Sequence, residues 1–390
     1  MTGYDVIVVG AGPAGLAFAR SLDGTALRIA IVERQRRELL AAPASDGREI
    51  ALTHRSVATL QALDAWRRID PGEIAPLRGA RVLNGGSRFA LSFDAHAAGE
   101  ERIGQLVPNH QIRRSLFAAV AAQAGVTLFA DSGVVAATTD AEGVAVTLDD
   151  GRVLGARLLV AADSRFSALR DQLGIAAEIN RLGRSMMVCR VAHERDHGGI
   201  ATECFDHGQT IAMLPLNGGL SSAVLTLSST AIDRLAALDA RALGAELTRR
   251  YEARLGAMRL VERPHLYPLA TTYARHFAAT RAALIGDAAV GMHPVTAHGF
   301  NLGLRGAMTL GTLVGEAAAR RHDIAAPALL RRYEAAHRVA SRPIYAATNM
   351  IVALYTTENP LAHVARHAAL RAAARLPLVR EGVNRMLTRH

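Results

Sequence analysis

The chain has little cysteine, few aromatic residues and no long hydrophobic run. Its 390 residues include two cysteines, Cys189 and Cys204, and aromatics make up 4%. Two distant cysteines form neither a disulfide framework nor a CxxC redox pair, so we expect buried free thiols. No run of about 20 uncharged apolar residues occurs, which argues against a spanning helix. The first residues lack a cationic signal segment and begin a strand by Asp5, so a cytoplasmic protein is expected.

Acidic residues are fewer than basic ones, 35 against 45, which gives a net charge of +10. This balance favours anionic partners such as phosphates or acidic lipids. Few aromatics and no recognised binding module argue against nucleic acid as the partner. No metal site is expected. The 50% apolar content supplies a sizeable core, enough for two domains or for one domain with a large insertion.

The most informative segment is DVIVVGAGPAG, residues 5–15, an apolar run that opens into Gly10, Gly12 and Gly15. Such a pattern predicts a strand that turns into a helix whose N-terminus faces a pyrophosphate. A second apolar run, LRIAIVE, ends in Glu33, eighteen residues beyond Gly15. A carboxylate at this distance binds ribose hydroxyls, whereas an NADP site favours arginine. The sequence therefore predicts an FAD or NAD site, against the alternative of a glycine turn that only packs two elements.

The rest of the chain predicts a mixture of helices and strands. We expect a helix from near Ser56, extended chain over 78–93 and a helix over 110–124, followed by a β-meander around the turn at 149–151. A second antiparallel sheet is expected over 181–272, with a hairpin at Asn217-Gly218-Gly219 and one helix over 231–255.

Two further motifs follow apolar runs. One is LLVAADSRFSALR, residues 158–170, with Asp163; the other is Gly286-Asp287, followed by Pro294, Gly299 and Asn301. They resemble the DG and GD motifs of the flavoprotein aromatic hydroxylases, the group A flavin monooxygenases. With the first motif they occur in the order of that family, along the whole chain.

Within this superfamily the chain resembles the FAD-dependent hydroxylases of ubiquinone biosynthesis (UbiH/UbiF-like), and more narrowly the UbiM type. The narrower resemblance rests on DGREIALTHRS (46–56), on LLVAADSRFSALR and on GDAAVGMHPVTAHGFNLGL (286–304). Two positions depart from the wider family. Ser164 replaces the glycine of the DG motif, and Ala297-His298 replaces the usual Gly-Gln before Gly299.

The resemblance implies an α/β fold: a GxGxxG Rossmann-like FAD-binding domain with an inserted antiparallel substrate sheet and C-terminal helices, similar to p-hydroxybenzoate hydroxylase. The expected division assigns 1–77, 101–180 and 273–345 to FAD binding, 78–100 and 181–272 to the substrate domain, and 346–390 to a C-terminal helical region.

Several residues acquire roles through the resemblance. Arg48 is expected to reach the FAD pyrophosphate, unless it is a solvated loop arginine. Asn109 either contacts the cofactor or caps its helix. Asp163 either bonds near the cofactor or holds Arg170. Asp287 is expected to accept hydrogen bonds from the ribityl chain.

The remaining expected contacts surround the flavin. The resemblance implies that Val134 contacts the cofactor and that Pro294 shapes the loop at the reactive face. Backbone amides of Gly299 and Asn301, at a helix start, would stabilise reduced flavin. His293 and His298 flank this loop and are candidate catalytic bases that titrate near neutral pH, with structural roles as the alternative.

The implied reaction is ring hydroxylation by a flavin C4a-hydroperoxide, with O2 and a polyprenyl phenol or quinol as substrates, of the 5-demethoxyubiquinol kind. No second GxGxxG occurs, so NAD(P)H or another donor would act as a transient reductant. The absent cysteine pair argues against a disulfide reductase, and a single tryptophan, Trp66, argues against a flavin halogenase. An FAD-dependent prenyl-lipid reductase of the same fold and a non-catalytic FAD-loaded scaffold are the alternatives.

The last thirty residues, 361–390, hold six arginines and one acid, Glu381, between apolar residues. A basic amphipathic segment can lie on an anionic membrane, which would suit a lipid substrate and association with other ubiquinone-biosynthesis enzymes. The alternative is a helix that docks on the catalytic body.

Overall fold

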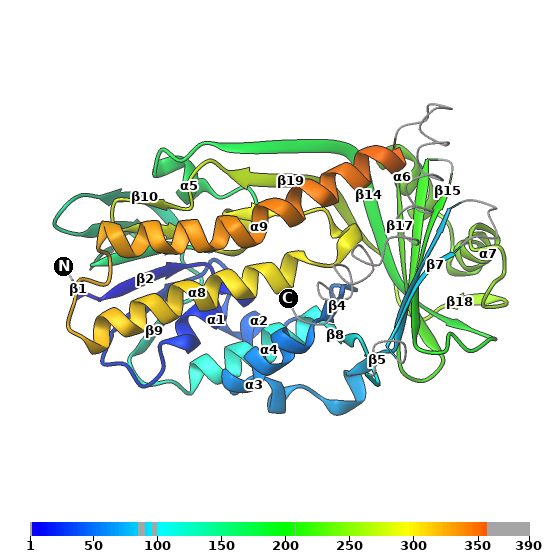
Figure 1. The fold of residues 1–390 in the computed structure, drawn as a ribbon, viewed down its shortest axis with the longest axis horizontal. Coiled ribbons are helices and arrows are strands. Elements are labelled where there is room, and N and C mark those ends of the chain that lie inside the picture. Colours follow the sequence, from blue (N-terminus) through cyan, green and yellow to red (C-terminus); the bar gives the residue numbers. More distant parts are fainter. Residues whose placement is uncertain (1, 85–89, 96–99, 207, 357–390) are drawn as a thin grey trace.

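The computed structural model describes residues 2–84, 90–95, 100–206 and 208–356. Two large sheets lie at opposite ends of the view, with the long helices α8 (Gly299–Ala319) and α9 (Pro327–Thr356) beside the first (Figure 1). The expected amphipathic tail over 361–390 lies outside the described residues. Within the described ranges, none of the helices combines the length and hydropathy needed to cross a bilayer.

The first sheet has six strands, of which five are parallel and the last pairs antiparallel at one edge. Its order is β20 (Ala278–Ala279), β21 (Ala282–Leu284), β13 (Leu158–Ala161), β2 (Val6–Val9), β3 (Ile29–Val32) and β9 (Val126–Phe129). The three central strands are buried along their whole length, as is typical of a parallel sheet covered on both faces.

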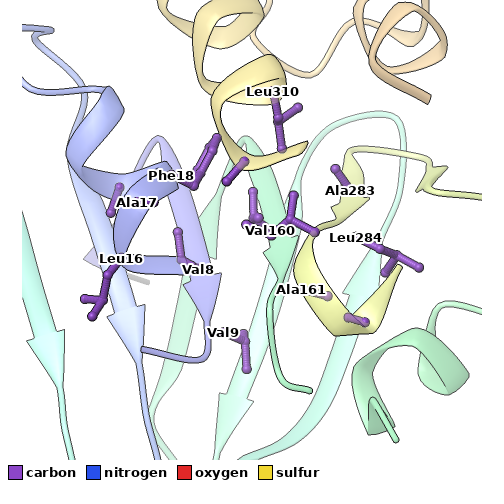
Figure 2. Close-up of a cluster of buried hydrophobic side chains, with 14 of the residues drawn as sticks. Val8, Val9, Leu16, Ala17, Phe18, Val160, Ala161, Ala283, Leu284 and Leu310 are labelled. Carbon is purple, nitrogen blue, oxygen red and sulfur yellow. The ribbon is translucent and has the colours of Figure 1, made fainter. Parts of the chain in front are cut away.

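Helices pack on this sheet through apolar side chains. Figure 2 shows α1 (Pro13–Ser21) and α8 contributing Phe18 and Leu310 to the cluster above β2, β13 and β21. Helix α4 (Asn109–Ala121) packs against α1, and α9 packs against α8. Because the paired strands β21, β13, β2 and β3 are parallel, their carboxyl ends lie at one edge of this sheet.

The second sheet has nine strands and is antiparallel except where β15 pairs with β6. Its order is β22 (Val290–Gly291), β19 (His265–Ala274), β14 (Ala177–His193), β17 (Leu220–Ser228), β16 (Gln209–Pro215), β15 (Ile200–Asp206), β6 (Gly79–Asn84) and β7 (Ala90–Asp94), and β18 (Met258–Leu260) also pairs with β14. Alternate residues of each strand point to opposite faces. Met187 and Cys189 pack toward helices, whereas Met186 and Val188 face the opposite side.

The expectation of one helix over 231–255 is wrong. Two helices, α6 (Ser229–Ala236) and α7 (Ala240–Arg250), cover one face of the second sheet, and α7 is visible at its outer side (Figure 1). The cause is a new N-cap at Asp239, whose side chain accepts a hydrogen bond from the amide of Ala242 at 2.7 Å. The hairpin at 217–219 is confirmed, because it joins the paired strands β16 and β17.

Two smaller sheets complete the fold. One joins β1 (Thr2–Gly3), β12 (Val153–Ala156), β11 (Val144–Leu148) and β10 (Val134–Thr139); the other joins β4 (Glu49–Leu52), β8 (Gly104–Pro108) and β5 (Ala75–Leu77). The expected meander is therefore β10 to β12 only, because β9 instead extends the parallel sheet beside β3. Short helices lie at α2 (Arg37–Ala41), α3 (His54–Ala62), α5 (Ala168–Gln172), η1 (Trp66–Arg68), η2 (Pro71–Glu73), η4 (Gly286–Ala288) and η5 (Pro294–Thr296).

Both cysteines are free, Cys189 being buried and Cys204 half-buried. Burial raises the pKa of the Cys189 thiol to about 12, so this thiol is inert at neutral pH.

Candidate active site

A cavity of about 1290 Å³ reaches from the edge of the parallel sheet to the inner face of the nine-stranded sheet. Ligand pockets typically measure about 300–1,000 Å³, so this space has room for a cofactor and a substrate together. All but two of the residues predicted from the sequence line it. The lining set is Gly10, Gly12, Glu33, Arg48, Asn109, Val134, Asp163, Asp287, His293, Pro294, His298 and Gly299; the exceptions are Gly15 and Asn301.

Three motifs far apart in the sequence meet because their strands are neighbours. Strand β2 leads to Gly10, β13 to Asp163 and β21 to Asp287, and β13 lies between the other two. All three strands are parallel, so their carboxyl ends share one edge. Ligands of open α/β sheets bind outside this edge.

The three glycines of the fingerprint have different surroundings. Gly10 has a φ of +106°, and a Cβ there would meet the carbonyl oxygen of Ala162 at 2.4 Å. A Cβ on Gly15 would meet the carbonyl oxygen of Gly10 at 2.1 Å, so this glycine allows the close approach of α1 to β2. A Cβ on Gly12 meets no protein atom within 4 Å and points into open space at the cavity. Gly12 is therefore free for a ligand such as a pyrophosphate, and the cradle fits a dinucleotide.

Glu33 has a structural role that the sequence did not predict. Its Oε2 accepts a hydrogen bond from the amide of Ala11 at 2.7 Å, and its Oε1 accepts from the amide of Gln35 at 2.9 Å. The carboxylate thereby fixes the glycine turn against β3. Each oxygen keeps a second lone pair, so the side chain still fits a ribose at the cavity.

Arg48 belongs to a cluster that the sequence did not predict. Its guanidinium donates to Asp46 at 2.6 Å, Asn109 donates to the same carboxylate oxygen at 2.7 Å, and the hydroxyl of Tyr267 donates to the backbone oxygen of Asp46 at 2.5 Å. Burial alone would raise the pKa of Asp46, but the charge and hydrogen bonds of Arg48 and the hydrogen bond of Asn109 hold this pKa below its usual range. Arg48 is thus oriented rather than freely solvated. The residue preceding the helix of Asn109 is Pro108, and Asn109 forms no side-chain cap.

Asp163 does not hold Arg170, so that alternative is wrong. Its carboxylate accepts from the Ser167 hydroxyl at 2.5 Å and from the amide of Leu169 at 3.2 Å, which organises the start of α5. Arg170 is buried and donates to the backbone oxygens of Arg165 and Ala288.

Arg165 connects the second motif to the third. It donates to a carboxylate oxygen of Asp287 at 3.0 Å, to the backbone oxygen of Met292 at 3.3 Å and to that of Ala270. The side chain of Asp287 remains 42% exposed within the cavity lining. The sequence analysis did not predict a role for Arg165. Its position in the second motif, two residues after Asp163, could have indicated that it lies at the same edge of the sheet.

Both departures from the family glycines retain a glycine-like backbone. Ser164 has a φ of +89° and Ala297 a φ of +53°. Non-glycine residues rarely adopt positive φ, so neighbouring contacts hold these turns in place. Ser164 and Ala297 thus adopt backbone conformations that favour glycine.

The loop before α8 is more constrained than expected. His293 is buried, its Nδ1 accepts from the amide of Val295 at 3.2 Å, and burial together with Arg165 and Arg184 lowers its pKa to about 4. The expected titration of His293 near neutral pH is therefore wrong, and Nε2 carries its proton. His298 is buried directly before α8.

Asn301 acts on the scaffold through its side chain. Its amide donates to the backbone oxygens of Ala51 and Ala297 and accepts from the amide of Thr53, which fixes β4 to the start of α8. The first backbone bond within the helix runs from Leu302 to His298. The backbone amides of residues 299–301 come before this bond and have no acceptor within the helix. They are therefore available for the predicted contact with the flavin ring.

The far wall of the cavity is the inner face of the nine-stranded sheet, and it is largely apolar. Its residues come from five strands: Ala80, Val82, Leu91, Phe93, Met186, Val188, Ala212, Leu214 and Val224. Glu203 on β15 lies among them. We call this part of the cavity the chamber. Sequence reasoning missed Glu203, for which the only signal was an acid within an otherwise weakly polar strand.

Comparison with known proteins agrees with this geometry. A family model described as FAD binding domain matches residues 3–347. Ubiquinone hydroxylase UbiM of Neisseria meningitidis is 44% identical over 98% of this chain and 84% of its own length, and ubiquinone hydroxylase UbiL of Rhodospirillum rubrum is 34% identical over 96% and 87%. The chain belongs to the family of FAD-dependent ubiquinone hydroxylases. It is an FAD-dependent monooxygenase, and the expected resemblance is confirmed.

The fold class is confirmed as well. The crystal structure of p-nitrophenol 4-monooxygenase PnpA from Pseudomonas putida superimposes with a TM-score of 0.75 over 100% of both chains, at 17% identity. At this identity the likeness shows the fold alone.

Proposed function

We propose that this enzyme hydroxylates the aromatic ring of a polyprenylated phenol or quinol intermediate in ubiquinone biosynthesis. The observation that carries the proposal is one continuous cavity that joins the cofactor edge to an apolar chamber. Family membership supplies the reaction class, and the names of the similar proteins from Neisseria and Rhodospirillum supply the substrate class.

The residues at the sheet edge suit FAD. We propose that the amide of Gly12 and the N-terminus of α1 bind the pyrophosphate, with Arg48 as a further donor. Glu33 would bind the ribose, Asp287 the ribityl chain, and the amides at the start of α8 the flavin ring. Bound FAD supplies the oxygen-activating redox chemistry, with NAD(P)H or another donor as transient reductant.

The protein supplies orientation and exclusion of water. The apolar chamber wall would bind the ring and the first isoprene units, and Pro294 with the loop before α8 would separate them from solvent. His293, neutral and hydrogen-bonded through Nδ1, can donate through Nε2 but is a weak base.

The reaction is tested by anaerobic reduction of the FAD-loaded enzyme, followed by a demethoxyubiquinol analogue and labelled O2. We expect a product heavier by one oxygen atom, with the label on the ring. Flavin reoxidation that yields only hydrogen peroxide would contradict the proposal and favour the prenyl-lipid reductase.

We further propose that the polyprenyl tail leaves the chamber toward a membrane. Met350 and Ile351 of α9 line the cavity, and Met350 is 69% exposed although apolar. The arginine-rich segment 361–390 follows directly in the sequence. Peripheral contact with an anionic bilayer would place the part of the cavity lined by Met350 and Ile351 next to the lipid that holds the substrate.

Vesicle flotation tests the membrane contact. The full chain should float with vesicles that contain anionic lipid and not with neutral ones. Replacing Arg366, Arg371 and Arg375 by glutamine should reduce flotation without loss of bound FAD. Equal flotation of the variant and the unaltered chain would contradict the contact.

A further inference from the structure

Glu203 is the acidic side chain of the chamber wall, and the strand geometry directs it into the cavity. On β15 the side chains of residues 201, 203 and 205 share the face that lines the cavity, whereas Cys204 packs against the cluster beneath α6 and α7. The two residues paired with Glu203 are Ala212 on β16 and Val82 on β6, and both line the same cavity.

Within the part of the chain that the structure describes, the carboxyl group of Glu203 has no partner. Its cross-strand neighbours are apolar, and among the described residues neither a hydrogen bond nor an ion pair is made by its side-chain oxygens. Desolvation by burial raises the pKa of Glu203 to about 8, so the group is mainly a neutral acid at neutral pH. Glu203 is half-buried and lines the cavity, so a ligand that fills the cavity displaces water from its carboxyl group. Burying a polar group without a partner is costly, so such a ligand has to offer the carboxyl group a hydrogen bond.

The chemistry of the chamber limits what that ligand can be. The wall is mostly apolar, with Thr210 and Thr226 as further polar lining residues and Glu203 as its neutral carboxylic acid. Such a wall fits a flat, uncharged molecule with a polar group at a fixed place. A ring hydroxyl satisfies this requirement, because it donates one hydrogen bond to the carboxyl oxygen and can accept one from the acid O–H. A cation would need an ionised carboxylate, and a purely apolar ligand would leave the acid unpaired.

We propose that Glu203 binds the ring hydroxyl of the aromatic substrate and selects a free phenol or quinol against its methyl ether. The inference rests on the proposed function and extends it, since it names the group that orients the ring. Glu203 therefore acts through direct contact with the substrate, at the wall opposite the cofactor edge.

Binding to the oxidised, FAD-loaded enzyme provides the first test. The probes are a phenol with a short isoprenoid tail and its methyl ether, and flavin fluorescence reports their affinity. We expect the unaltered enzyme to bind the phenol at least about ten-fold more tightly than the ether. Glu203→Met has similar volume and no carboxyl group, so this preference should fall to twofold or less. Glu178→Met is the matched control, because Glu178 is exposed on β14 outside the cavity and its replacement should keep the preference.

Infrared difference spectroscopy tests the contact without relying on a variant that must fold. Adding the phenol to the unaltered holoenzyme should shift the C=O stretch of a protonated carboxyl group to lower frequency, and adding the ether should not. The isosteric variant Glu203→Gln assigns this band by its disappearance.

The outcomes separate this inference from the proposed function. If the unaltered enzyme prefers the phenol and hydroxylates it, yet Glu203→Met keeps the preference or the carboxyl band does not respond, the role of Glu203 is overturned and the function stands. If the unaltered enzyme binds neither probe and forms no hydroxylated product, both are overturned.

Discussion

The cofactor edge of the parallel sheet and the chamber wall of the nine-stranded sheet are built on different principles. At the edge, short motifs follow single strands, and backbone groups with nearby polar side chains form the site. At the wall, alternate side chains from six strands form the surface, and no motif marks any of them. A site made by backbone turns is visible in a local sequence, whereas a site made by strand alternation depends on which strands become neighbours.

The largest expected effect distinguishes two glycines within the cofactor edge. Gly10→Ala would combine an unfavourable positive φ with a contact at 2.4 Å to the Ala162 oxygen, so the free energy of unfolding should fall by at least about 2 kcal/mol. Gly12→Ala meets no protein atom, so the stability of the FAD-free protein should change by less than about 0.5 kcal/mol. Its affinity for FAD should nevertheless fall ten-fold or more, because the Cβ occupies the ligand space.

Denaturant unfolding of the FAD-free variants and fluorescence titration with FAD measure the two quantities. Equal destabilisation by both substitutions would contradict the assignment of Gly12 to the ligand rather than to packing.

The sequence predicts the cofactor edge in detail because each of its motifs carries its own strand and turn. It identifies Gly10, Glu33 and Asp287 without knowledge of strand order. It cannot identify Asp46 or Tyr267, because the hydrogen bonds that Asp46 accepts from Asn109 and from Tyr267 join segments 63 and 221 residues apart. Glu203 is hidden for the same reason, since its exposure to the cavity depends on the pairing of β15 with β6. The environment of His293 also depends on burial, which local sequence does not supply.

The pH dependence of the free energy of unfolding tests the environment of Glu203 in the chamber wall. Glu203 has a pKa raised from 4.5 to about 8 in the folded protein, so the folded state binds more protons than the unfolded state between these values. Its contribution to the free energy of unfolding is therefore present at low pH and is lost as pH rises through this window, by up to about 1.4 kcal/mol per pH unit. Glu203→Gln cannot ionise and should lack this slope. Denaturant unfolding at several pH values between 5 and 7.5 measures the difference, and parallel curves for the two proteins would contradict the raised pKa of Glu203.

An intermediate effect is expected for Arg48 at the cofactor edge. Arg48→Lys keeps the charge but loses the planar fork that holds Asp46 through both Nε and Nη2. We expect FAD to bind about ten-fold more weakly, with little change in the stability of the FAD-free protein. Arg67→Lys is the matched control, because Arg67 also contacts an aspartate, Asp64, through Nε and Nη2 but lies outside the cavity. If Arg48→Lys binds FAD with unchanged affinity, Arg48 does not contact the cofactor and is a solvated loop residue.

The smallest effect concerns the helices behind the chamber wall, where the pattern of apolar residues predicted a single helix. In one continuous helix, Asp239→Ala would stabilise the protein slightly, because alanine is the better helix former. With Asp239 as the N-cap of α7, the same change removes a hydrogen bond to the amide of Ala242 and should lower the free energy of unfolding by about 1 kcal/mol. Asp239→Asn retains a capping side chain and should cost much less. Denaturant unfolding of Asp239→Ala measures the change in the free energy of unfolding. A decrease supports two helices divided at Asp239, and an increase supports one continuous helix. Helical spacing of apolar residues continued through this segment, but a capping side chain at its middle divided the helix.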